Sequence, residues 1–64
     1  MMENSLILEM NLTEAQAMAL AQLVKRISYR ELRTNASSDS EADRMHEAVA
    51  ELQDALARIG YAPR

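Results

Sequence analysis

The residue best suited to acid–base or metal chemistry is His46, the single histidine of the chain. Asp43 and Glu47 lie within one helical turn of it, so two carboxylates and the imidazole would face one point on a helix. Helical bundles bind metals with such pairs, but several helices then supply the ligands. One turn supplies too few ligands for a metal ion. We therefore predict a partly exposed His46, no metal site and no cofactor.

The other residue types used in catalysis have no catalytic spacing. Serines occur along the chain, yet none is placed with both a base and an orienting group, as nucleophilic catalysis requires. Cysteine is absent, and the single glycine, Gly60, excludes a glycine-rich phosphate loop. We therefore predict that the protein is not an enzyme.

A basic cluster lies in the middle of the chain, where four cationic residues and one tyrosine fall within nine positions. The basic cluster comprises Lys25, Arg26, Tyr29, Arg30 and Arg33. Such a cluster binds phosphate or an acidic protein, or it balances a helix end and neighbouring acids. Ten acidic residues against seven basic ones give a net charge of −3, which opposes binding to nucleic acid. We expect no nucleic-acid partner and regard the cluster as a candidate surface for a protein.

An acidic ridge follows, in which four acidic residues recur at spacings of four, four and three. The acidic ridge comprises Asp43, Glu47, Glu51 and Asp54. It is either a docking surface for a basic partner or a solvated face that keeps a helical bundle soluble. Like charges at these spacings cost only about a few tenths of a kcal/mol, so we favour the solvated face.

These side chains need helices to position them, and the first predicted helix spans residues 13–35. Thr13 and Gln16 match the capping-box pattern, in which a hydroxyl caps the helix start and the third helical residue reaches back. The residues that follow are mostly alanine, leucine, methionine and glutamine, which favour helix. The apolar face of this helix comprises Leu20, Leu23, Val24 and Ile27.

Ser28 is a candidate break in this helix. Ser28 and Glu31 match a second capping box, and Leu32 lies off the apolar face of the preceding residues. A kink or a short extra helix at 29–35 explains both observations. A continuous helix through Arg33 is the competing interpretation, because serine is tolerated within helices.

The clearest helical pattern spans residues 40–59, after a polar connector. Its apolar residues recur at alternating spacings of three and four, which is an a/d repeat over nearly three heptads. They are Ala42, Met45, Val49, Leu52, Leu56 and Ile59. Gly60 fits the left-handed position that ends a helix, and Tyr61 can cover Leu56 there. Residues 60–64 form the expected tail.

Residues 1–11 stand apart as an arm or a strand. Leu6, Leu8, Met10 and Leu12 alternate with Ile7, Glu9 and Asn11. This alternation predicts a short β-strand at 5–11. A single strand has no partner in a helical chain, so it must pair with a second copy, pack as an extended arm, or extend the following helix.

Together the elements predict one all-α domain over residues 1–64, built as an antiparallel helical hairpin. The chain has no phenylalanine or tryptophan, and much of its apolar content is alanine, so the core is thin. A hairpin also leaves one side of each apolar face open. We therefore expect a homodimer closed as a four-helix bundle. Its core and interface would comprise Leu20, Leu23, Val24, Ile27, Met45, Val49, Leu52, Leu56 and Ile59.

The stretches LTEAQA through LVKR (12–26) and LQDALARIGYAPR (52–64) resemble a family of short uncharacterised proteobacterial proteins. The resemblance covers residues 12–64 and rests on helix-forming and capping residues. It implies a phage, plasmid or genomic-island neighbourhood, and no established activity comes with it. That setting makes host-directed regulation, including anti-CRISPR inhibition, a candidate class.

We predict a non-enzymatic, dimeric, helical module for protein–protein interaction, whose partner is an unidentified protein. One alternative is an inhibitor of a host defence complex, which would use the acidic ridge or the basic cluster. The other is a DNA-binding regulator of the ribbon–helix–helix kind, because strand, helix and helix follow in that order. Its chemistry fits poorly, since the ribbon would present Ile7, Glu9 and Asn11 to the bases.

Location follows from two further features of the sequence. No stretch approaches the roughly 18 uninterrupted apolar residues of a membrane span. The first four residues carry no basic charge and precede no long apolar segment, so we expect no signal peptide. We therefore expect a cytoplasmic protein with no membrane partner.

Overall fold

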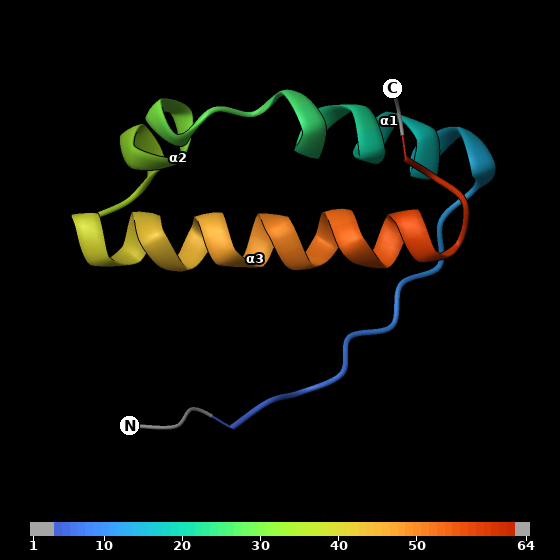
Figure 1. Ribbon diagram of the computed structural model, residues 1–64, viewed down its shortest axis with the longest axis horizontal. Coiled ribbons are helices and arrows are strands. Elements are labelled where there is room, and N and C mark those ends of the chain that lie inside the picture. Colours follow the sequence, from blue (N-terminus) through green and yellow to red (C-terminus); the bar gives the residue numbers. More distant parts are fainter. Residues whose placement is uncertain (1–3, 63–64) are drawn as a thin grey trace.

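The computed structural model describes residues 4–62, in which three helices are joined by short connectors (Figure 1). The helices are α1 (Glu14–Arg26), α2 (Tyr29–Asn35) and α3 (Asp39–Arg58). Both α1 and α2 pack on α3, which runs along the length of the molecule. The described part of the chain is therefore all-α and contains no strand. Residues 1–3 of the expected arm and residues 63–64 of the expected tail lie outside the described residues.

The start of α1 is a complete capping box. The Gln16 amide donates to Thr13 Oγ1 at 3.1 Å, and the Thr13 amide donates to Gln16 Oε1 at 2.9 Å. Glu14 in the first turn and Lys25 and Arg26 in the last suit the helix dipole. The predicted start of this helix is confirmed.

The predicted break at Ser28 is real, and the continuous helix is wrong. Ile27 and Ser28 both have extended backbone, with ψ values of 131° and 159°. Ser28 Oγ accepts a hydrogen bond from the Glu31 amide, and the Glu31 carboxylate accepts one from the Ser28 amide at 3.1 Å. This second capping box starts α2, and the new helix buries Leu32. In a continuous helix Leu32 would lie off the apolar face, and the break changes the direction of its side chain so that it is buried.

Helix α3 starts and ends one residue before the predicted span of 40–59. Ser38 Oγ accepts from the Glu41 amide at 3.1 Å, as a helix cap does. The Glu41 carboxylate accepts from the amide of Ser37, at 2.7 Å, so the start of α3 is capped without the reciprocal pairing of a capping box.

The end of α3 is a Schellman motif. The Tyr61 amide donates to the Leu56 carbonyl at 2.8 Å, and the Gly60 amide donates to the Ala57 carbonyl at 3.0 Å. Gly60 has φ of +97°, a conformation that a residue with a side chain adopts only with strain. Tyr61 packs on the core beside Leu56, as the sequence predicts.

The core is small and built largely from alanine. Its buried members are Ala17, Ala21, Val24, Leu32, Ala42 and Leu56. Leu20, Val49, Leu52 and Tyr61 pack against its central cluster but stay partly exposed. Alanine at the helix contact brings helix axes close, yet it removes little apolar area from water. A single chain therefore has a thin core.

The strand predicted at 5–11 is wrong for the single chain. Residues 4–12 have no regular secondary structure and run away from the helices as an extended segment, which we call the arm (Figure 1). A strand needs a neighbouring backbone to pair with, and a single helical chain offers none to the arm. Within one chain the segment neither forms a strand nor extends α1, and its pairing with a second copy stays a prediction.

Candidate interaction surface

An apolar groove of about 920 Å³ lies between the arm and α3. The arm contributes Leu6, Ile7, Leu8, Met10 and Leu12. Helix α3 contributes Ala48, Glu51, Leu52, Ala55, Leu56, Arg58 and Ile59, and Leu20 comes from α1. All but two of these side chains are apolar, so the groove suits an apolar occupant.

The helical repeat explains why this side of α3 stays open. Leu52 and Leu56 turn toward α1 and the core. Ala48, Ala55 and Ile59 recur at spacings of seven and four, so they share a face beside that contact. Ile59 is 68% exposed. The small side chains at 48 and 55 leave a shallow trough next to the core contact.

The arm does not fill the groove that it borders. Leu6, Ile7 and Leu8 are 84%, 93% and 74% exposed. None of the arm residues was among the site residues predicted from the sequence. The period-two alternation from Leu6 to Leu12 is the signal that points to them, because it places apolar side chains on one side of an extended segment.

The predicted core and interface residues divide into three groups. Val24 and Leu56 are buried, whereas Leu20, Ile27, Met45, Val49 and Leu52 are half-buried. Leu23 and Ile59 are exposed, at 56% and 68%. The last two are not core residues of the single chain, and their place in an interface stays a prediction.

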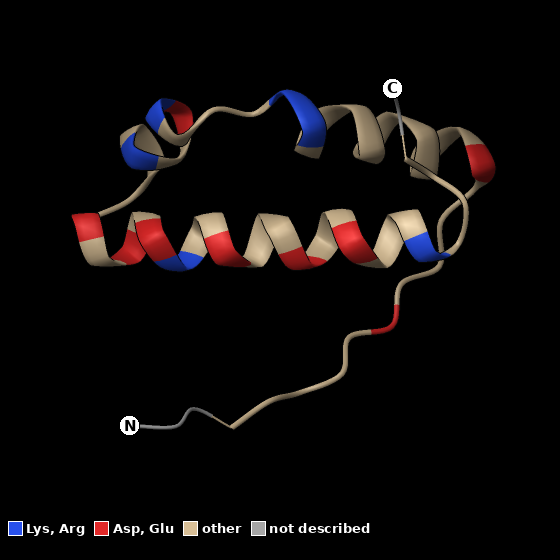
Figure 2. Cartoon of the chain, viewed as in Figure 1, with Lys and Arg blue, Asp and Glu red and all other residues tan. Residues whose placement is uncertain are grey.

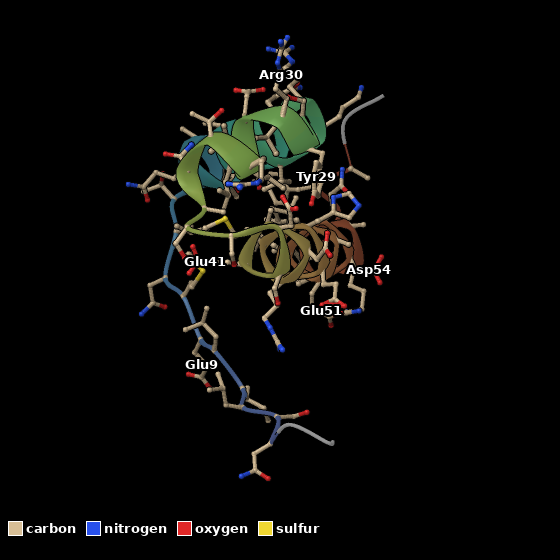
Figure 3. All side chains as sticks on the ribbon, turned by 90° about the vertical axis from the view of Figure 1, so that its left-hand side faces the viewer. Glu9, Tyr29, Arg30, Glu41, Glu51 and Asp54 are labelled. Carbon is tan, nitrogen blue, oxygen red and sulfur yellow. The ribbon has the colours of Figure 1, made fainter. Side chains whose placement is uncertain are left out.

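The side chains of the basic cluster do not all point the same way. Arg30 points outward from α2, away from α3 (Figure 3). Arg33 turns toward the start of α3, where its Nε donates to Asp39 Oδ1 at 2.6 Å and its Nη1 donates to the Ala36 carbonyl at 3.1 Å. Lys25 and Arg26 lie exposed at the end of α1. The cluster is therefore not a single phosphate cradle.

Tyr29 begins α2, and its side chain points toward α3 while staying 42% exposed (Figure 3). Its hydroxyl donates to Asp43 Oδ1 at 2.8 Å, and its ring meets His46 edge-on with centroids 6.0 Å apart. The hydrogen bond to Asp43 raises the pKa of Tyr29, because the carboxylate favours the protonated phenol. Tyr29, Asp43 and His46 therefore link two helices.

Most of the acidic ridge is solvated. Acidic residues recur along α3, while basic residues gather at the end of α1 and in α2 (Figure 2). Glu51 and Asp54 lie on the side of α3 that faces away from α2 (Figure 3). Asp43 differs, because it accepts the Tyr29 hydrogen bond. Within residues 4–62, no three histidine, cysteine, aspartate or glutamate side chains gather closely enough to hold a metal ion.

Among the described residues, no helix has the length and apolarity that crossing a membrane requires.

Comparisons with known proteins add one finding to this geometry. The chain matches no curated protein and no solved structure. One family model matches residues 1–64. The chain therefore belongs to the family of unknown function DUF7706.

Proposed function

We propose that the protein is a non-enzymatic interaction module, a helical hairpin that self-associates through its apolar surface and then docks on another protein. The observation that carries the proposal is the apolar surface left open on one chain. Among residues 4–62, nine large apolar or aromatic side chains are exposed, and five of them belong to the arm. The five arm residues and Ile59 line one groove, and monomeric proteins rarely expose large contiguous apolar patches.

The total exposed area supports the same proposal. The chain exposes 5,661 Å², whereas a folded monomer of 7.2 kDa exposes about 4,100 Å² by the surface–mass relation. Its radius of gyration is 12.9 Å, against about 10.7 Å for a compact chain of this length. A thin alanine core and an excess of about 1,500 Å² of surface favour a chain that completes itself by association.

The charged surfaces are the candidate sites for a second protein. Arg30 projects outward from α2, and the Glu51–Asp54 part of the acidic ridge projects from α3 away from α2. Glu51 also lines the apolar groove. Arg30 and Asp54 lie off the groove, so a dimer would carry two copies of each of these charges. A protein partner of opposite charge would bind there, with an affinity that falls as the salt concentration rises.

The oligomeric state tests the proposal directly. Sedimentation velocity and light scattering of the purified chain at micromolar concentration should give about twice the 7.2 kDa of one chain. A compact, cooperatively melting monomer would overturn it. A chain that dimerises should also melt at a temperature that rises with protein concentration.

A dimeric DNA-binding regulator is the second candidate, because an extended arm precedes two helices that pack together. A net charge of −3 and the acids along α3 oppose it. A gel-shift experiment at physiological ionic strength separates the two, since salt-sensitive, sequence-specific binding would favour the regulator. The mobile-element setting and the inhibition of a host defence complex stay predictions.

A further inference from the structure

We propose that the apolar groove of each chain is occupied by the arm of a second copy, so that two chains exchange arms. This inference rests on the self-association proposed above and names the segment and the surface that produce it. In each chain the arm borders one side of the apolar groove without filling it, and α3 presents an apolar face on the other side. Two copies related by a two-fold axis can satisfy both features with two identical contacts.

The arm is least exposed at its end next to α1. Met10 is 51% and Leu12 is 38% exposed, against 84% for Leu6. The end of the arm next to α1 therefore touches its own chain, while the far end projects into solvent, as Figure 1 shows. The exposed far end of the arm is therefore available to a second molecule.

The chemistry of the arm matches the groove. In an extended segment, Leu6, Leu8 and Met10 share one side, and the single charge of the segment, Glu9, lies on the other. Packing the leucine side on α3 therefore buries no charge. The two charged residues that line the groove, Glu51 and Arg58, belong to exposed positions of α3.

The lengths also match. Leu6 to Leu12 spans about 20 Å when extended, and Ala48 to Ile59 spans about 17 Å along a helix. A specific interface of standard size buries about 800 Å² on each partner. The total exposed area of one chain is about 1,500 Å² above that of a compact monomer of its mass, so surface of that order is open to a second copy.

Matched substitutions test the arm. Leu8→Asp places a charge on the apolar side of the arm, and Asn11→Asp places the same charge on the other side. Both positions are exposed in the single chain, so neither change should unfold it. We expect Leu8→Asp to raise the dissociation constant of the dimer at least about tenfold and Asn11→Asp to leave it unchanged. Equal effects of the two would overturn the proposal.

A second pair tests the groove from the side of α3. Ala55 lines the groove. Ala50 is also an exposed alanine of α3, but it lies about 140° around the helix axis from Ala55 and does not line the groove. Ala55→Glu should weaken the dimer, and Ala50→Glu should not. Circular dichroism of all four variants shows whether helix content is kept. A dimer that survives Leu8→Asp and Ala55→Glu would overturn arm exchange while self-association stands.

Disulfide trapping distinguishes exchange from an arm that folds back on its own chain. The natural chain has no cysteine, so Leu8→Cys with Ala55→Cys introduces the sole pair. We expect a covalent dimer after mild oxidation, and we expect Leu8→Cys with Ala50→Cys to give much less of it. Closure within one chain, or a dimer that forms no cross-link, would overturn the proposal. A wild-type chain that stays monomeric would overturn both arm exchange and self-association. The groove would then be a candidate site for a different protein.

Discussion

The hydroxyl of Tyr29 donates a 2.8 Å hydrogen bond to Asp43, fourteen residues later, and so links α2 to α3. A carboxylate acceptor favours the protonated phenol, so the pKa of Tyr29 is raised from its usual value of 10.0. The stability that this contact adds is fully present below the pKa of an unfolded tyrosine. It is lost as the pH rises through the higher pKa of the folded state.

Tyr29→Phe should therefore lower the melting temperature at neutral pH and have less effect in strong alkali. The variant lacks the hydroxyl, so the difference between wild type and variant isolates this group from the other residues that titrate there. Thermal melts followed by circular dichroism between pH 7 and 11 measure it. A difference that stays constant across this range would show that the hydrogen bond to Asp43 contributes nothing to stability.

Leu56→Ala should be the most destabilising truncation on α3. Leu56 is 4% exposed and belongs to the central cluster of the core. Removing a buried leucine costs about 2–5 kcal/mol, a large share of the free energy of unfolding of a small domain. Leu23→Ala is the control, because Leu23 is 56% exposed. Urea denaturation should rank the two clearly, and similar losses would place the core elsewhere.

Gly60→Ala should destabilise the end of α3 through its backbone alone. Apart from Gly60 and its two chain neighbours, no atom of residues 4–62 lies within 4 Å of the position that a new Cβ would take, so the cost comes from the φ of +97°. Left-handed backbone costs a residue with a side chain about 1–2 kcal/mol. Asparagine tolerates this conformation better, so Gly60→Asn should lose less. Equal losses in thermal denaturation would argue against backbone strain as the cause.

Arg30→Ala combined with Arg33→Ala should change the free energy of unfolding by less than about 1 kcal/mol. Arg30 points away from α3, and the pair of Arg33 and Asp39 is exposed on both sides. Binding to DNA at physiological ionic strength should be absent in wild type and variant alike. Salt-sensitive DNA binding that the double change abolishes would contradict the expectation that nucleic acid is not a partner.

The local signals in the sequence predict the helices well, because each depends on residues within one turn. The hydroxyls of Thr13 and Ser28 cap the helices that follow them, and Gly60 ends α3 as expected. The choice between a kink, a new helix and a continuous helix at Ser28 depends on where Leu32 is buried. That burial is set by packing against α3, so the sequence alone left the choice open.

The groove could not be predicted in the same way. Its two sides, the arm and the face of α3 around Ala55, lie more than forty residues apart in the chain. Leu23 and Ile59 follow the apolar repeat as well as Leu56 does, yet only Leu56 is buried. The repeat gives the width of an apolar face, while the neighbouring helix decides which part of that face is covered.

The alanine-rich core has a calorimetric consequence. Ala17, Ala21 and Ala42 release little apolar surface when the helices separate, and exposure of apolar surface is what raises the heat capacity on unfolding. An average chain of 64 residues gains about 0.8–1.0 kcal/mol per kelvin. One chain of this protein alone should gain less, so its stability should change only slowly with temperature. An increment at or above that average would require additional apolar surface to be buried before unfolding. That surface is exposed in one chain, so the additional heat capacity would measure the contact between chains.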